Sequence, residues 1–366
     1  MSVPFTDLKA QYLSIKDEID EAVFSVINQG SYIQGDIVHQ FESNFADYLG
    51  AKRCIGVANG TDALEIALKS LGIGIGDEVI VPALSWMSTA GAVSNVGAKP
   101  VFVDVLESEK TIDPDGIEIK ISNKTKAIIP VHLYGLPARM TDILAIAKKH
   151  NLKVVEDCAQ AHGAEIDGKR VGTFGDVSAF SFYPTKNLGA YGDAGGIITN
   201  DNGIAQTCRM ISNYGQMSKH DHQVVGRNSR LDSLQAAILK AKLPHLEKWI
   251  DARQQVAAWY ADKLSGVVLP IIPQDLRHAF HLFVIQSKDR TSLIKKFDKA
   301  EIGYGIHYPT PLPFQKCYAD QNHKLGDFPI AEKLCNEVIS LPIYPEMKEE
   351  WVGRVCEVLN NSTSDE

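Results

Sequence analysis

A single lysine follows an abrupt break in a short apolar strand. The strand is predicted from Ala179 to Phe182 and ends before Pro184, because proline has no amide hydrogen to donate to a sheet. Lys186 comes directly after this break, in a loop rich in glycine, which lets the backbone approach a ligand closely. Such a lysine is either an ordinary surface charge or an amine that forms a Schiff base with a carbonyl compound.

An aspartate upstream favours the reactive interpretation. The apolar residues Val154 and Val155 predict a buried strand that ends near Asp157, and open α/β sheets bind ligands at the carboxyl ends of their strands. A Schiff-base lysine and an aspartate that pairs with a pyridinium nitrogen are the minimal equipment for pyridoxal phosphate chemistry. Asp157 could instead cap a following helix, so the interpretation also needs a phosphate site.

A phosphate site is predicted where a strand over 54–58 turns into a helix over 63–71. The start of a helix presents free amides and a partial positive charge, and both favour an anion. We therefore expect Gly60 and Thr61 to hold the phosphate. The alternative is a plain helix start capped by Thr61 or Asp62.

The composition is that of a globular protein that can fill a core. The chain has 366 residues, of which 45% are hydrophobic and 22% charged. Its net charge of −8 lacks the basic excess of a nucleic-acid surface, and neither a secretory signal nor a membrane-length apolar run is visible. The six cysteines are scattered, as free thiols are in a reducing cytosol. We predict a cytoplasmic protein that binds neither nucleic acid nor a membrane.

Strands and helices alternate over the first two thirds of the chain, which predicts an α/β fold with a mostly parallel central sheet flanked by helices. Shorter elements after Pro244 indicate a smaller C-terminal α/β domain. We therefore divide the chain into a large domain, 1–245, and a small domain, 246–366. The predicted elements include a helix over 8–28, a strand over 127–133 that contains His132, a strand over 303–308 and a frayed tail over 360–366.

Two motifs, Glu156–Gly163 and Ser181–Leu188, resemble those of the DegT/DnrJ/EryC1/StrS family, and the resemblance extends over residues 33–343. It implies a fold-type I, pyridoxal-phosphate-dependent aminotransferase that acts on nucleotide-linked keto sugars, with Lys186 as the catalytic residue. A dehydratase subgroup of the family has histidine in place of this lysine, so Lys186 disfavours a sugar dehydratase. A non-enzymatic regulatory relative is a further alternative, which the set of Lys186, Asp157 and Gln160 disfavours.

The resemblance also implies how pyridoxal 5′-phosphate is held and that two subunits share each site. Gln160 would lie near the ring hydroxyl, and Trp86 would stack on the ring unless it is a core tryptophan. A homodimer is implied, in which Asn228 and a loop like 31–35 reach the neighbouring subunit's site; Asn228 could instead belong to a helix-capping segment. The expected cofactor contacts are Gly60, Thr61, Trp86, Asp157, Gln160, Ser181, Lys186 and Asn228 of the partner subunit.

The substrates follow from the same resemblance. L-glutamate would donate the amino group to C-3 of a thymidine-linked 3-keto-6-deoxyhexose, which gives a deoxyamino sugar for lipopolysaccharide or an S-layer glycan. The alternatives are C-3 amination of a uridine-linked 3-keto uronate, with Arg230 as carboxylate partner, and C-4 amination of a 4-keto-6-deoxy sugar. The expected sugar contacts are Tyr183, Lys219, His220, Arg230, His307 and Tyr308.

One expected sugar contact has a simpler alternative, and one pair of histidines raises the question of a metal. His307 and Tyr308 lie before a proline-rich turn that need not bind a ligand. The alternating His220 and His222 are too few for zinc, which takes three or four protein ligands. We therefore expect no metal.

Overall fold

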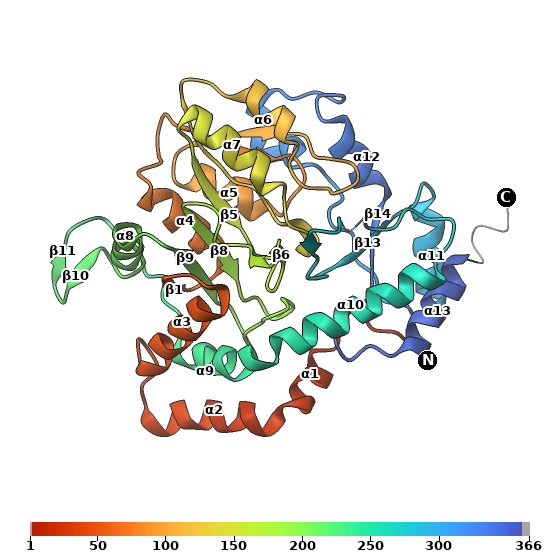
Figure 1. Cartoon of the computed structure of the whole chain (residues 1–366), viewed down its shortest axis with the longest axis horizontal. Coiled ribbons are helices and arrows are strands. Elements are labelled where there is room, and N and C mark those ends of the chain that lie inside the picture. Colours follow the sequence, from red (N-terminus) through yellow and green to blue (C-terminus); the bar gives the residue numbers. More distant parts are fainter. Residues whose placement is uncertain (1, 272, 361–366) are drawn as a thin grey trace.

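A seven-stranded sheet forms the centre of the molecule (Figure 1), which we describe from a computed structural model covering residues 2–271 and 273–360. All of the predicted tail after Asn360 lies outside these residues. Only β9 runs antiparallel to its neighbours, β1 and β8, so the prediction of a mostly parallel sheet is confirmed. In sheet order the strands are β1 (Arg53–Val57), β9 (Gly195–Thr199), β8 (Val177–Ser181), β5 (Lys153–Asp157), β4 (Thr125–Ile128), β2 (Glu78–Pro82) and β3 (Lys99–Val103).

Successive strand residues point to opposite faces of this sheet, and each face packs into its own core. Val155, Ala179 and Ile197 face one core, whereas Val154 and Phe180 face the other. The strands read as continuous apolar runs because helices cover both faces. The first core takes helices α4 (Gly60–Ser70), α5 (Met87–Asn95), α8 (Asn202–Ser212) and α12 (Pro329–Glu337); the second takes α3 (Asp36–Leu49), α6 (Pro114–Lys120), α7 (Met140–His150), α9 (Ser233–Lys242) and the start of α10 (Leu246–Lys263).

A third core lies in the C-terminal part, between the rest of α10 and a two-stranded antiparallel sheet of β13 (Phe283–Gln286) and β14 (Val338–Leu341). Helices α11 (Arg290–Ala300) and α13 (Glu349–Asn360) complete it, and Val3 joins it from the N-terminus. Residues between Leu312 and Val338 pack instead against the first core of the central sheet. The division at 245/246 stays a prediction.

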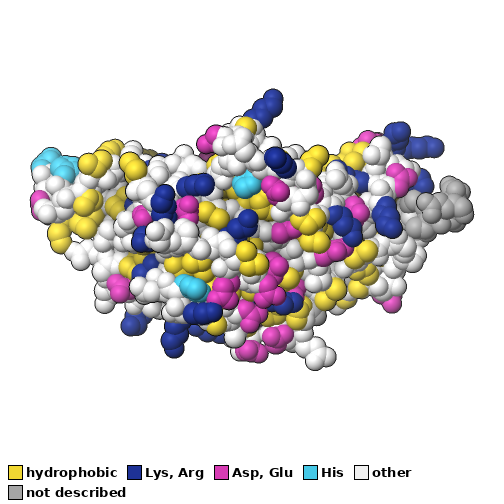
Figure 2. All heavy atoms as spheres, turned by 90° about the horizontal axis from the view of Figure 1, so that it is seen from above, with side chains coloured by type: hydrophobic (Ala, Val, Ile, Leu, Met, Phe, Trp, Pro, Cys, Tyr) yellow, Lys and Arg dark blue, Asp and Glu magenta, His cyan; other side chains and the backbone are white. Residues whose placement is uncertain are grey.

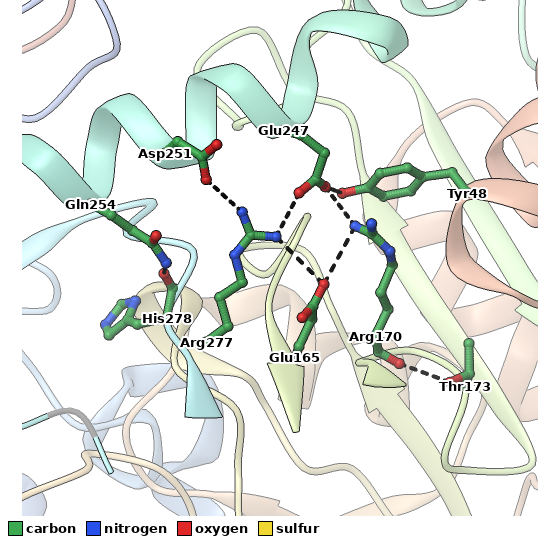
Figure 3. Close-up of polar contacts among 9 residues, drawn as sticks. All are labelled: Tyr48, Glu165, Arg170, Thr173, Glu247, Asp251, Gln254, Arg277 and His278. Atoms are coloured by element: carbon green, nitrogen blue, oxygen red, sulfur yellow. Dashed lines mark hydrogen bonds and ion pairs between the residues drawn. The ribbon is translucent and has the colours of Figure 1, made fainter. Parts of the chain in front are cut away.

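A network of charges ties α10 to a small sheet on the surface (Figure 3). Glu247 of α10 accepts hydrogen bonds from Arg170 and Arg277, both at 2.6 Å, and from the Tyr48 hydroxyl. The two arginines belong to β7 (Lys169–Arg170) and β12 (Leu276–Arg277), which both flank β6 (Glu165–Ile166). The network therefore fixes the start of α10 against this three-stranded sheet.

Three predicted elements differ from the structure. The helix over 8–28 is two helices, α1 (Leu8–Ser14) and α2 (Lys16–Gln29), because Ile15 leaves helical geometry and packs with Trp249. The strand over 303–308 is absent: Gly305 makes a single bridge to Ser340, while β14 takes the place beside β13. His132 lies beyond β4, which ends at Ile128.

Charged side chains of both signs lie on the face of the molecule shown in Figure 2. No described helix is long and apolar enough to cross a membrane. In Figure 2, lysine and arginine side chains alternate with aspartate and glutamate over the face shown, without one basic field.

A hairpin of β10 (Gln216–Ser218) and β11 (Asp221–His222) projects at the left edge of Figure 1.

Candidate active site

The Lys186 loop is a tight turn that leaves the end of β8. The Lys186 amide donates to the carbonyl of Tyr183 at 2.8 Å, and the chain returns so that the Ala190 amide donates to Phe182. Gly189 passes so close that a Cβ there would lie 2.3 Å from the carbonyl oxygen of Pro184, so only glycine fits. Desolvation within the walls of the site lowers the pKa of Lys186 to about 8, although the nearby Asp157 carboxylate opposes the shift.

Asp157 ends β5, the strand next to β8, as predicted. Its carboxylate accepts hydrogen bonds from the Thr89 hydroxyl at 2.8 Å and from the Ala159 amide at 3.1 Å. Burial raises the pKa of Asp157, and these two bonds together with the charge of Lys186 act in the opposite direction. A cationic partner in the cavity would therefore favour the ionised carboxylate.

Lys186 and Asp157 line one cavity of about 710 Å³ at the carboxyl ends of the strands. This volume suits a small cofactor together with part of a substrate. The structure brings most of the predicted site residues into its walls: Gly60, Thr61, Trp86, Asp157, Gln160, Ser181, Tyr183, Lys186, His307 and Tyr308.

One end of the cavity is formed by the start of α4. The helix is capped by Asn59, whose side chain accepts from the Asp62 amide, so neither Thr61 nor Asp62 is the cap. The amides of Gly60 and Thr61 have no carbonyl one turn earlier to bond. A Cβ on Gly60 would lie 2.6 Å from that of Ser181, so glycine lets this helix start approach the end of β8.

Aromatic and imidazole groups also line the cavity. Gln160 donates to the Tyr308 hydroxyl at 2.9 Å and accepts from the Tyr134 amide at 2.7 Å. The ring of Trp86 is 60% exposed and lies 5.7 Å from that of Tyr308, so it is not a core tryptophan. Burial and then the charge of Lys186 lower the pKa of His307 to about 4, which leaves a neutral ring at pH 7.

Four predicted residues do not line this cavity. Lys219 and His220 are exposed on the β10–β11 hairpin. Asn228 and Arg230 line a second hollow, of about 350 Å³, together with Ile33. The two hollows share Asp193 in their walls. Within one subunit, therefore, these four residues are separate from Lys186.

The structure also brings in residues that sequence reasoning missed. Thr89 reaches Asp157 from α5, and His281 enters the cavity wall just before β13. Asn187, next to the lysine, donates to the carbonyl of Ala279 at 2.8 Å. Only Asn187 had a signal, its place inside the second motif; the other two are close to the site only after folding.

A buried group of His132, Glu156 and Cys158 has the composition of a metal site. Glu156 accepts from the amides of Gly172, Phe174 and Gly175, and His132 lies 3.1 Å from it through Nε2. The other ring nitrogen of His132 accepts from the Ala138 amide at 3.0 Å. Because both ring nitrogens and both carboxylate oxygens already have protein partners, this group holds the loops together.

The cavity offers the groups that pyridoxal phosphate requires. An amine with a lowered pKa, a buried carboxylate and a helix start with nearby hydroxyls match its carbonyl, ring nitrogen and phosphate. The fold, with this lysine and aspartate at the ends of adjacent strands, is that of fold-type I pyridoxal-phosphate-dependent aminotransferases. A model of the DegT/DnrJ/EryC1/StrS aminotransferase family matches residues 13–360, and the chain belongs to this family.

Three relatives illustrate the range of the family. A dTDP-3-amino-3,6-dideoxy-alpha-D-galactopyranose transaminase of Aneurinibacillus thermoaerophilus is 46% identical over 98% of this chain and 99% of its own. A UDP-N-acetyl-3-dehydro-alpha-D-glucosamine 3-aminotransferase of Acidithiobacillus ferrooxidans is 44% identical over 99% of this chain and 98% of its own. A protein of Geobacillus stearothermophilus that is named a pleiotropic regulatory protein is 46% identical over 98% of this chain and 97% of its own.

The solved structure of DesV from S. venezuelae, in complex with a ketimine intermediate, is similar throughout. It has a TM-score of 0.97 and 41% identity, and the match covers 100% of this chain and 99% of DesV. The chain is thus a pyridoxal-phosphate-dependent aminotransferase in fold and family.

Proposed function

We propose that this aminotransferase moves the amino group of L-glutamate to C-3 of a nucleotide-linked keto sugar, in particular a dTDP-linked 3-keto-6-deoxyhexose. The observation that carries the proposal is the cavity in which Lys186 and Asp157 face His307 and Tyr308. The relatives named for C-3 amination support it, because they match this chain from end to end.

Each group of the cavity has a role in this proposal. Bound pyridoxal phosphate supplies an electron sink that stabilises negative charge on the carbon that loses a proton. Lys186 holds the cofactor by its amine and, once freed, carries the proton on Nζ between the two carbons of the transfer; its lowered pKa suits that task. Asp157 keeps a positive charge on the ring nitrogen. Gly60, Thr61 and Ser181, with Asn228 of the partner subunit, hold the phosphate, Gln160 meets the ring hydroxyl and Trp86 covers the ring.

Which carbon of the sugar is aminated depends on how the sugar is oriented in the cavity. The residues that would hold the cofactor are fixed in the fold, so the sugar would have to present one carbonyl to that place. Tyr183, His307 and Tyr308 can set that rotation by hydrogen-bonding the neighbouring hydroxyls, with Lys219 and His220 as further contacts. A buried donor left unpaired by the wrong sugar costs binding energy, which gives selectivity.

The test compares catalytic efficiency on three substrates, each with L-glutamate as the donor: a dTDP-linked 3-keto-6-deoxy sugar, a UDP-linked 3-keto uronate and a 4-keto-6-deoxy sugar. We expect the first to be preferred by about tenfold or more. Preference for the uronate would transfer the proposal to the UDP-linked 3-keto uronate, with Arg230 as the carboxylate partner. Preference for the 4-keto sugar would contradict C-3 amination.

The proposal includes a homodimer with shared sites in the cytoplasm. Asn228 and Arg230 lie outside the Lys186 cavity of their own chain, which supports a role in the partner's site. The six free cysteines, five of them buried, support a reducing compartment. Use of the amino sugar in lipopolysaccharide or an S-layer glycan rests on the family resemblance.

A further inference from the structure

His281 is a cavity residue that the proposed roles leave unused. Its side chain lines the same cavity as Lys186 and is only 8% exposed. The ring nitrogen Nδ1 is enclosed by protein and has no hydrogen-bond partner among the described residues. Nε2 is not among the enclosed atoms without a partner, and since His281 lines the cavity we assign Nε2 as the ring nitrogen that faces it. Since a buried N–H without an acceptor is rarer than an unused lone pair, the proton belongs on Nε2.

The backbone that presents His281 is held in a strained shape. Phe280, directly before it, has a φ of +44°, which a residue with a side chain rarely adopts. Buried donors fix the carbonyls on either side: Asn187 bonds Ala279, and Arg253 bonds Phe280 at 3.1 Å. Strain of this kind persists where the surroundings over-determine it, as they do in binding sites.

Asn187 connects the segment that carries His281 to the loop that carries Lys186. It follows Lys186 in the sequence and is itself almost fully buried. Its bond to Ala279 therefore couples the lysine loop to the segment 278–281, although the two lie about ninety residues apart in the chain. The position of the His281 ring relative to the lysine is consequently fixed by the protein.

Cationic groups are the charges that act most strongly on His281. Burial, and then the charges of Lys186 and Arg253, hold the pKa of His281 well below its ordinary value, so the ring is neutral at pH 7. His307 and His162 act on it in the same direction, and the carboxylate of Asp157 lines the same cavity. Of the described residues that line the cavity, Lys186 is the only lysine or arginine. Within one subunit, a carboxylate in the cavity has Lys186 as its one cationic partner among the described lining residues, so neutral donors such as an imidazole N–H are needed as well.

We propose that Nε2–H of His281 donates a hydrogen bond to a carboxylate of the amino-acid donor and so forms part of the donor-binding site. The inference rests on the proposed function, since it assumes an amino-acid donor. Gln160 is already assigned to the ring hydroxyl, and it also bonds Tyr308 and Tyr134. His281 thus serves the donor, whereas His307 and Tyr308 serve the sugar.

The test separates the two halves of the reaction. The holoenzyme is mixed with L-glutamate, and the loss of cofactor absorbance gives the donor half-reaction; the pyridoxamine form is then mixed with the keto sugar. For His281→Leu we expect the glutamate concentration that gives half the maximal rate to rise by about ten- to hundredfold, because a hydrogen bond to a charged group is lost. The sugar half-reaction should change by no more than about twofold. His281→Gln, which keeps an N–H donor, should recover most of the loss.

His278→Leu is the matched control. His278 is a buried histidine of the same segment, whose Nδ1 accepts from the Phe280 amide at 2.9 Å, but it does not line the cavity. If His281 acted only through the shape of the segment, both variants would slow both half-reactions alike, which would overturn the inference. Unchanged glutamate dependence in His281→Leu, or a defect confined to the sugar half-reaction, would overturn it too. A wild-type enzyme that reacts with glutamate but with no keto sugar would contradict the proposed function alone.

Discussion

The Asp157 carboxylate has a cost of burial that its hydrogen bonds do not fully offset. Its pKa is raised by burial, and Thr89 and Ala159 supply two hydrogen bonds that favour the ionised form. Asp157→Asn keeps the shape and removes the charge, so we expect the donor half-reaction to slow by about a hundredfold or more. Single-turnover absorbance measures this rate. Thr89→Val, which removes one bond and keeps the charge, should have a smaller effect; equal rates in wild type and Asp157→Asn would contradict the role.

The neighbouring residue, Glu156, is structural. Its carboxylate accepts from three backbone amides, and although burial alone would raise the pKa, the bond with His132 and these amides hold it below its ordinary value. In Glu156→Gln one oxygen becomes a donor that faces other donors. We expect the free energy of unfolding to fall by about 3–5 kcal/mol, which urea denaturation measures. A loss below about 1 kcal/mol would show that the loops do not depend on this carboxylate.

At the scale of elements, α10 depends on the charge network of Figure 3. Burial alone would raise the pKa of Glu247, but the bonds from Tyr48, Arg170 and Arg277 lower it to about 2. Since 40% of the side chain is exposed and solvent screens the charges, Glu247→Gln should cost only about 1 kcal/mol. This stabilisation is complete above the ordinary glutamate pKa of 4.5 and is lost as the pH falls towards 2.

Thermal unfolding of wild type and Glu247→Gln between pH 7 and pH 3 measures this difference. We expect the gap in Tm to be largest at neutral pH and to narrow below about pH 4.5. Asp251→Asn is the matched control, because Asp251 bonds the same Arg277 from a far more exposed position. A gap that widens on acidification would contradict the ionised state assigned to Glu247.

The elements also show what the sequence could predict and what it could not. Lys186 and Asp157 were predictable because Asp157 ends one apolar strand and Lys186 lies in the loop that follows another, and the carboxyl ends of parallel strands lie at one edge of the sheet. The strand over 303–308 was wrong because its place beside β13 is taken by β14, a contact between segments far apart in the chain. His281 and Thr89 could not be found for the same reason: nothing near them in the sequence indicates which cavity they enter.

At the scale of the whole molecule, the proposed active sites are shared between two subunits. Lys219, His220, Asn228 and Arg230 do not line the Lys186 cavity of their own chain, and the resemblance assigns Asn228 to the partner's phosphate. Lys186→Ala and Asn228→Ala should each be inactive as homodimers. After mixing and subunit exchange, each hybrid has one site with both lesions and one with neither. We expect about a quarter of wild-type activity from an equal mixture, and continued inactivity after proven exchange would contradict shared sites.

The most direct test of the whole account is the location of the cofactor. The holoenzyme is reduced with borohydride, digested, and mapped by peptide mass spectrometry. Burial lowers the pKa of two other lysines, Lys110 and Lys242, to about 8 as well. The label therefore distinguishes the place of Lys186 in the cavity from a lowered pKa alone. The account predicts a pyridoxyl label on Lys186 alone; a label on Lys110, Lys242 or any other lysine, or a reduced holoenzyme without a label, would contradict it.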